Sequence, residues 1–329
     1  GRKKPVFCKS IVAPDGRLYY NLLLHGTTTG RPACRNPNLL NQPRGPMIRS
    51  QYKASPGHIF VEVDLNQAEL RCLAILSGDP TLIDIYTKNE VSIHDVTTEA
   101  FFASKKVMEE DPGVLNRCAD LLQYFGERTP KLVYHEAKMA AKTVNFGIVY
   151  GREAHSIAQV FNVSHQEAQR WINAWFERYP AAGSYIKQCR ATVVRNQRMV
   201  TPFGRMKRVG VATPEKLHDL QNEAANFPHQ SIAHDITLSA GLECESRIHE
   251  LGGRFWLDLY DALYFEIPEE DECVSEAITL LQRTLTRIPR DLGLTRIPFI
   301  GDAKIGYNWG HMKDWQGSIG ETLGEQEAA

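Results

Sequence analysis

The stretch KMAAKTVNFGIVYG, residues 138–151, constrains the fold more than any other part of the chain. Four of its residues recur at intervals of four: Lys138, Lys142, Phe146 and Tyr150. On an α-helix this spacing places two ammonium groups and two aromatic rings in one row. Such a row suits a nucleoside triphosphate, because cations attract phosphates and rings stack on a base. An amphipathic helix with half-buried rings gives the same spacing, so the pattern alone leaves both interpretations open. The opposite side is small or apolar and is expected to pack on the body of the protein: Met139, Ala140, Thr143 and Val144.

Two aspartates far apart in the sequence each adjoin an apolar run with alternating residues. Asp64 ends the run HIFVEV, and Asp261 lies within RFWLDLYDALYFEIP, which predicts a β-hairpin with this aspartate near its tip. Adjacent strands in one sheet would bring both carboxylates together, where their repulsion raises a pKa unless cations screen them. Hard oxygen ligands suit Mg²⁺, and two such ions about 3.5–4 Å apart can stabilise the attacking and leaving oxygens of a phosphoryl transfer. Taken singly, either residue is equally explained as a turn or capping aspartate.

Composition narrows the class of protein. The chain has 329 residues, a net charge of −1, and hydrophobic and charged fractions of 43% and 23%, as in a soluble globular protein of one or two domains. A near-neutral chain has no global basic field, so any nucleic-acid surface must be local. The seven cysteines form no CxxC pair and indicate reduced thiols. We therefore expect an intracellular, cytoplasmic protein, located in a host cell or an organelle if its source is a phage or an organelle. No uncharged apolar run approaches the roughly 18 residues of a membrane helix, so no membrane partner is expected.

Three motifs, in the same order, resemble those of family A DNA polymerases, the bacterial polymerase I type. DLNQAELR (64–71) resembles motif A, usually DYSQIELR; the 138–151 stretch resembles motif B, usually RxxxKxxxFGxxYG; LYDALYFEI (259–267) resembles motif C, usually VHDELVFEV. The resemblance covers about residues 30–309. It implies an α+β fold, a right-hand palm of antiparallel sheet and helices with helical fingers. The implied division is 1–80, N-terminal palm with motif A; 81–200, fingers with motif B; 201–329, C-terminal palm with motif C; a complete thumb and an exonuclease domain are expected to be missing.

The resemblance implies a template-directed DNA polymerase that transfers nucleotides from dNTPs to a primer 3′-hydroxyl and releases pyrophosphate, with two Mg²⁺ ions as cofactors. The implied metal ligands are Asp64, the backbone carbonyl of Leu65, and Asp261. Lys142 is the implied proton donor to pyrophosphate, which makes it catalytic together with the two aspartates. The implied nucleotide-binding residues are Lys138, Lys142, Phe146, Tyr150, Glu69, Gln67 and His94; among them Glu69 crowds a ribose 2′-hydroxyl.

Further segments imply contacts with primer-template DNA. TGRPACRNPNLLNQP (29–43) is similar to the family's TGRLSSxxPNLQNIP, NFPHQ (226–230) is similar to NAPMQ, and a GRR-like turn lies in TPFGRMKR (201–208). The implied DNA-binding residues are Arg31, Asn38, Asn41, Arg205, Asn226 and Gln230. The basic turn is equally explained as a solvated loop. Besides DNA and dNTPs, the expected partner is a thumb or exonuclease segment, from the rest of the gene or from another chain.

Four of the departures from the family's motifs bear on its chemistry: Lys138 and Asn222 replace Arg, Tyr260 replaces His, and Ala262 replaces Glu. A lysine offers a point charge where arginine offers a bidentate fork, which predicts weaker triphosphate binding. With the thumb missing, we also expect weak, poorly processive DNA binding. Two alternatives remain open: a non-catalytic nucleic-acid-binding scaffold with a polymerase fold, and a single-subunit RNA polymerase. Glu69 and Phe146 argue against the second, because the RNA enzymes leave space at the first position and use a hydroxyl at the other.

Overall fold

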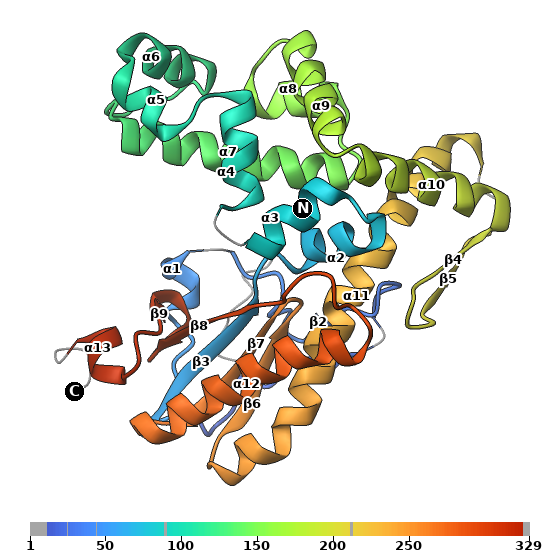
Figure 1. Cartoon of the computed structure of the whole chain (residues 1–329). Coiled ribbons are helices and arrows are strands. Elements are labelled where there is room, and N and C mark those ends of the chain that lie inside the picture. The colour runs from blue at the N-terminus through green and yellow to red at the C-terminus, as the bar shows by residue number, and fades with distance from the viewer. Residues whose placement is uncertain (1–11, 25, 44, 89–90, 211–212, 325–329) are drawn as a thin grey trace. The chain divides into compact units, whose positions relative to one another are not determined.

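The structure, a computed structural model, describes residues 12–24, 26–43, 45–88, 91–210 and 213–324 (Figure 1). The chain forms two compact units. The first, here called the sheet unit, consists of Gly1–Glu69 and Gln230–Ala329; the second, the helical unit, is Leu70–His229. We expected the corresponding changes at 80/81 and 200/201, and the assignment of the units to palm and fingers stays a prediction. Within the described residues, no helix is long and apolar enough to span a membrane.

An antiparallel sheet of five strands forms the centre of the sheet unit, with the order β6-β7-β3-β8-β9. The strands are β3 (His58–Leu65), β6 (Arg254–Leu259), β7 (Ala262–Pro268), β8 (Gly301–Gly306) and β9 (Lys313–Asp314). β3 is paired on both sides, and most of its residues are buried, which explains its nearly continuous apolar sequence. Two expectations are confirmed: a strand carries Asp64, and a hairpin places Asp261 in the turn between β6 and β7.

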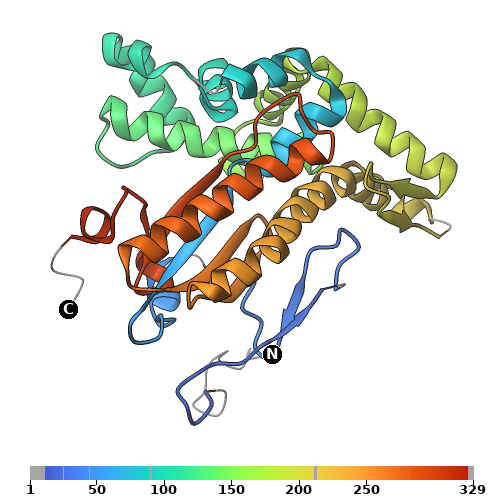
Figure 2. The same ribbon diagram turned by 60° about the horizontal axis from the view of Figure 1, so that its bottom comes forward.

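Two long helices pack on one face of this sheet. The helix α12 (Asp271–Asp291) packs across β3, β7 and β8, and its buried side chains recur at spacings of three and four, as an amphipathic helix requires. The helix α11 (Pro214–Glu250) continues through Pro228, and its part in the sheet unit begins at Gln230. Figure 2 shows α11 beside α12, where Arg247 of α11 pairs with Glu276 of α12. A Cβ at Gly241 of α11 would lie 3.2 Å from the Leu263 side chain of β7, so α11 and the sheet pack closely there.

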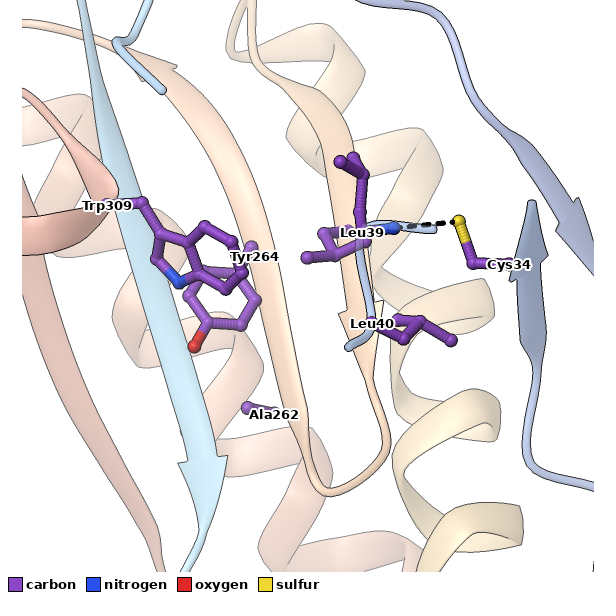
Figure 3. Packing of buried hydrophobic residues seen from close by; sticks show 7 residues of the cluster. Cys34, Leu39, Leu40, Ala262, Tyr264 and Trp309 are labelled. Atoms are coloured by element: carbon purple, nitrogen blue, oxygen red, sulfur yellow. Dashed lines mark hydrogen bonds between the residues drawn. The ribbon is translucent and has the colours of Figure 1, made fainter. Parts of the chain in front are cut away.

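The other face of the sheet holds the segment that follows residue 31. Its apolar residues pack with strand residues in one cluster: Cys34, Leu39, Leu40, Leu257, Ala262, Tyr264 and Trp309 (Figure 3). The Leu39 amide donates to Cys34 Sγ at 3.3 Å, and the Tyr264 and Trp309 rings meet edge to face at 6.0 Å. The small elements of this unit are β1 (Asn21–Leu23), β2 (Ala33–Arg35), α1 (Pro46–Arg49), η2 (Trp309–His311) and α13 (Ile319–Leu323). The cluster therefore anchors a polar, proline-rich segment to the sheet.

The helical unit consists of short and medium helices and one small hairpin. Its helices are α2 (Ala68–Ser77, which starts just before the unit boundary), α3 (Pro80–Lys88), α4 (Ile93–Phe101), α5 (Lys105–Glu110), α6 (Pro112–Leu121), α7 (Pro130–Val149), α8 (Ala154–Phe161), α9 (His165–Arg178) and α10 (Pro180–Asn196). The hairpin pairs β4 (Arg198–Val200) with β5 (Met206–Arg208). The helix α7 starts as its sequence predicts, with the Thr129 side chain accepting from the Leu132 amide and proline in the first turn.

The expected packing face of α7 is only half right. Ala140 and Val144 are buried, but Met139 is 48% exposed and Thr143 is also exposed. The buried stripe instead runs through Val133, Ala137, Ala140, Ala141, Val144 and Ile148. Alanines in this stripe let neighbouring helices pack closely: α4 lies against α7, and Ala137 packs with residues of α5 and α6. These contacts decide which side of α7 is covered.

Candidate active site

The two aspartates meet at one end of the sheet. Asp64 of β3 lies directly opposite Ala262 of β7 in the strand register, and Asp261 immediately precedes Ala262. The Leu65 amide donates to the Asp261 carbonyl at 2.8 Å and ties the strand to the turn. Residues far apart in the sequence are thus joined by antiparallel pairing, as the two strand-end patterns predicted.

Both carboxyl groups have pKa values above the ordinary value for aspartate. Burial, followed by repulsion from Glu62 and Asp261, raises the pKa of Asp64 to about 7, although Lys304 opposes the shift. Burial also raises the pKa of Asp261 to about 6; Arg31 lowers it and Glu69 raises it. Two acidic groups with raised pKa values at one strand end favour the approach of a cation.

Arg31 already supplies one positive charge to this end of the sheet. Its Nη2 donates to Asp261 Oδ1 at 3.1 Å and also to the carboxylate of Glu69. Its guanidinium lies 5.2 Å from the centre of the Tyr260 ring. In this structure the Arg31 side chain bridges two acidic residues, and the DNA contact that the sequence suggested for it stays a prediction. Glu69 is buried, with 5% of its surface exposed, and this ion pair fixes its direction.

The oxygen donors at this end are few. Among the described residues, no three His, Cys, Asp or Glu side chains gather as a metal site by themselves. The register explains part of this, because Ala262 faces Asp64 at the position where motif C usually has Glu. The predicted donors are two carboxylates, Asp64 and Asp261, and the backbone carbonyl of Leu65 at the end of β3. A further carboxylate, Asp302 of β8, lies opposite Asp64 in the strand register and accepts from Asn66 Nδ2 at 2.7 Å. The raised pKa values of the two predicted carboxylates and their hard oxygen chemistry fit Mg²⁺, which commonly binds one or two carboxylates and keeps its other positions for water and phosphate.

The predicted row on α7 lies on the accessible side of the helix. Lys142 is exposed, and within the described part of the chain no ion pair or hydrogen bond of its side chain is seen. Phe146 and Tyr150 are half-buried, and their rings stack at 6.1 Å with an interplanar angle of 24°. The spacing of four predicted two ammonium groups and two rings in one row. In the structure Lys142 is the exposed ammonium group beside two partly exposed rings, and Lys138 is paired with an acidic residue.

Lys138, by contrast, is held by an acidic residue that the sequence analysis missed. Its Nζ lies 2.8 Å from Asp95 Oδ1, and the Tyr134 hydroxyl donates to the same oxygen at 2.9 Å. Asp95 also completes a capping box with Ser92 at the start of α4. The capping pattern is visible in SIHD, but the sequence gives no sign that a lysine of another helix shares the carboxylate.

His94 lies beneath the aromatic part of the row. It is buried, with 6% exposed, and its ring centre lies 5.9 Å from that of Phe146. Burial, assisted by Lys142 and Lys138, lowers the pKa of His94 to about 4, so the ring is neutral. The neutral Nδ1 can accept from Asn145 Nδ2 at 3.0 Å. A supporting position under Phe146 agrees with the expected neighbourhood, and a contact of His94 with nucleotide stays a prediction.

The implied DNA-binding residues are divided between the units: Arg31, Asn38, Asn41 and Gln230 lie in the sheet unit, and Arg205 and Asn226 lie in the helical unit. Asn38 Oδ1 accepts from the Leu40 amide at 3.1 Å, and Asn226 Nδ2 donates to a backbone carbonyl at 2.9 Å. Arg205 lies in the turn between β4 and β5, and Gln67, with φ of 49°, lies just before α2. Nothing in the geometry of these residues tests a contact with DNA or nucleotide, so these roles stay predictions.

Comparison with known proteins identifies relatives of this chain. The profile of the family described as DNA polymerase family A matches residues 6–112 and 119–311. DNA polymerase I of Caldicellulosiruptor bescii is 30% identical over 310 residues, which cover 92% of this chain and 33% of the relative. The thermostable DNA polymerase I of Thermus aquaticus is 30% identical over 301 residues, which cover 89% of this chain and 32% of the relative. The chain therefore spans about a third of the length of these relatives.

A solved structure shares the fold. It is described as the POL domain of Pol1 from M. smegmatis in complex with DNA primer-template and dNTP, and it matches with a TM-score of 0.74 at 22% identity. The match covers 92% of this chain and 49% of the solved chain. The expected α+β polymerase fold, an antiparallel sheet with helices, is confirmed by this likeness.

Proposed function

The chain belongs to DNA polymerase family A, and from this membership we propose that it is a template-directed DNA polymerase. The proposed reaction adds a nucleotide from a dNTP to a primer 3′-hydroxyl and releases pyrophosphate. The observation that carries the proposal is the meeting of Asp64 and Asp261 on paired strands, with raised pKa values that call for a cation. The proposed partners are primer-template DNA and dNTPs.

Asp64, Asp261 and the carbonyl of Leu65 would hold Mg²⁺. Bound there, two ions would supply charge stabilisation for the attacking and leaving oxygens of the phosphoryl transfer. Since Arg31 now neutralises part of the charge on Asp261, cation binding requires this guanidinium to share or release the carboxylate. Released from Asp261, Arg31 would be available to the primer terminus, the contact that the family resemblance implies.

Lys142 is proposed to bind the triphosphate and to donate the proton that pyrophosphate needs on leaving. Its exposure and the absence of an ion pair within the described residues support this role, because a solvated ammonium group loses no existing partner when a phosphate binds. Phe146 and Tyr150 would offer their accessible ring surfaces to the bases. Lys138 contributes less attraction in this proposal, because Asp95 already balances its charge.

Glu69 is proposed to exclude the ribose 2′-hydroxyl. Its carboxylate is buried and is held by Arg31, so it does not move aside easily. A 2′-hydroxyl that approached it would have to displace that ion pair. This favours dNTPs over rNTPs and opposes the single-subunit RNA polymerase as an alternative.

Primer extension with Mg²⁺ and dNTPs tests the proposal. Asp64→Ala is expected to lower the extension rate about a thousandfold or more, since several kcal/mol of charge stabilisation are lost. Asp314→Ala, an exposed aspartate on β9 of the same sheet, is the matched control and is expected to extend at the parent rate. Equal rates for the parent and Asp64→Ala would refute the assignment.

The alternatives give different results in the same assay. A non-catalytic scaffold, favoured by the Lys138–Asp95 pair and by the missing carboxylate at Ala262, would bind primer-template without any Mg²⁺-dependent extension. An RNA polymerase would use rNTPs at least as well as dNTPs. For the proposed enzyme, Glu69→Ala is expected to raise rNTP incorporation relative to dNTP incorporation, with the parent strongly preferring dNTPs.

A further inference from the structure

The residue before Asp261 has a backbone conformation that needs support. Tyr260 has φ of 66°, in the left-handed region that side chains other than glycine rarely adopt. Two side chains hold its peptide groups. The Tyr260 amide donates to Asp258 Oδ1 at 3.1 Å, and its carbonyl lies 3.1 Å from His234 Nδ1. Because a carbonyl oxygen only accepts, Nδ1 of His234 must carry the hydrogen.

These two side chains form a buried pair between α11 and β6. His234 and Asp258 have side chains that are 1% and 3% exposed, and His234 Nε2 lies 3.8 Å from Asp258 Oδ2. Within the described residues, Asp258 Oδ2 has no hydrogen-bond partner. A buried pair of this kind is often no more stabilising than apolar residues of similar size. Its presence beside the turn that carries Asp261 therefore calls for a role other than overall stability.

The turn that the pair holds contacts β3, β6 and Arg31 at the acidic end of the sheet. The Asp261 amide donates to the Leu259 carbonyl at 2.9 Å, and the Asp261 carbonyl accepts from Leu65. The ring of Tyr260 lies beneath the guanidinium of Arg31, which in turn contacts the Asp261 carboxylate. A change in the Tyr260 peptide would thus move both the aspartate and the cation beside it.

We propose that His234 and Asp258 are positioning residues, which clamp the Tyr260 peptide and thereby hold the Asp261 carboxylate in the direction that nucleotidyl transfer needs. The catalytic consequence rests on the proposed polymerase function, whereas the clamp itself does not. Neither residue touches the reacting atoms. Loss of the clamp should therefore slow the chemical step and leave the binding of dNTP nearly unchanged, because the row on α7 is intact.

Substitutions at His234 separate the hydrogen bond from the volume of the side chain. His234→Leu removes the donor to the Tyr260 carbonyl; we expect kcat to fall about tenfold, with the KM for dNTP within about twofold of the parent. His234→Asn can place an amide N–H near the former Nδ1, and we expect it to recover kcat to within about threefold. Asp258→Leu and Asp258→Asn form the same comparison for the Tyr260 amide. Thr237→Val is the control, since within the described residues this buried hydroxyl on α11 bonds only its own helix, to the Ala233 carbonyl.

Hydrogen exchange at the Tyr260 amide reads the clamp without reference to activity. We expect slow exchange in the parent and in Thr237→Val, and exchange at least about tenfold faster in the two leucine variants. Unchanged exchange in those variants overturns the proposal, as does a parent-like kcat or an equal loss of kcat in the asparagine and leucine variants. If the leucine variants do not fold, the asparagine variants decide. Both must then keep slow exchange at the Tyr260 amide and keep kcat within about threefold of the parent, and a loss of either overturns the proposal. A parent chain without any extension counts against the polymerase proposal alone, and the exchange result still decides the clamp.

Discussion

The carboxylates of the sheet unit and the lysines of the helical unit carry opposite charges, and they differ in how the fold treats those charges. Asp64 and Asp261 lie at the ends of buried strands, and burial raises both pKa values toward neutrality. Lys142 is exposed to solvent on α7. A buried charge needs a partner, whereas water stabilises an exposed one. A bound cation would therefore stabilise the buried carboxylates of the sheet unit. In the helical unit, the exposed Lys142 can bind an anion at little cost in free energy.

Each unit also balances one of its charged groups internally. Arg31 contacts Asp261 in the sheet unit, and Asp95 contacts Lys138 in the helical unit. Asp64 and Lys142 are the members of each set without such a direct ion pair among the described residues. The comparison teaches that two residues of like charge in one unit need not be equivalent, and it predicts unequal effects of substitution.

The largest difference is expected between the two lysines of α7. Lys142→Ala should lower kcat/KM about a hundredfold or more, because it removes both a phosphate contact and a proton donor. Lys138→Ala should lower it by no more than about tenfold, because Asp95 already balances that charge. Single-nucleotide incorporation at a range of dNTP concentrations measures both effects.

Lys131, an exposed lysine in the first turn of α7, provides the control for these substitutions. Lys131→Ala is expected to behave as the parent. If Lys138→Ala is as damaging as Lys142→Ala, the ion pair with Asp95 does not reduce the contribution of Lys138, and the proposed inequality is wrong.

The burial of charge in the sheet unit should appear as a pH-dependent stability. Asp64 has an ordinary pKa of 3.8 and a folded-state pKa of about 7, so the folded chain binds more protons between these values. Stability is thus lost as the pH rises from about 4 to about 7. Asp64→Asn removes this loss and should raise the free energy of unfolding by up to about 4 kcal/mol at pH 8 in the presence of a chelator.

Thermal unfolding at several pH values checks this prediction. The gap between Asp64→Asn and the parent should widen from pH 5 to pH 8, and Mg²⁺ should narrow it by stabilising only the parent. Asp314→Asn, on an exposed strand of the same sheet, should show no such gap. A gap that is constant with pH would mean that the Asp64 charge is not the cause.

Sequence patterns predicted the parts of the site that lie within a single helix or strand, where side chains recur at a fixed spacing. The spacing of four on α7 and the alternating runs beside Asp64 and Asp261 correctly indicated the helix, the strand and the hairpin. The same runs led us to expect that the strands beside Asp64 and Asp261 would be adjacent in one sheet, and β3 and β7 are paired. The family motifs then added roles that no period could supply.

The parts that sequence did not predict depend on contacts between elements. Asp95 was visible as a helix cap, but its lysine partner lies on another helix. The pair of His234 and Asp258 joins a helix to a strand edge and has no spacing that marks it. The expected packing face of α7 was wrong at Met139 and Thr143, because packing against neighbouring helices decides which side is buried. Such contacts are set by tertiary packing, which local pattern does not encode.

A carboxylate restored beside Asp64 tests how far the sheet unit lacks negative charge. Ala262 lies opposite Asp64, so Ala262→Glu should bring a further carboxylate to the strand end and raise the affinity for Mn²⁺ about tenfold. Electron paramagnetic resonance of free Mn²⁺ measures it. Ala262→Gln has the same size without the charge and should leave the affinity near that of the parent. Equal affinities for both variants would show that the acidic end is already saturated with ligands.

The smallest effect is expected where the helical unit balances its own charge. Asp95→Asn keeps an oxygen for the helix cap but removes the charge opposite Lys138, whose side chain is 40% exposed. An ion pair at such an exposed site contributes about 0.2–1 kcal/mol, so the released lysine should lower the KM for dNTP about threefold with kcat unchanged. Asp84→Asn, which removes the exposed 2.8 Å pair with Lys88, is the matched control and should not alter KM. A higher KM in Asp95→Asn would reverse the interpretation, since Asp95 would then direct Lys138 toward the phosphates and the two units would use their internal counter-ions for opposite purposes.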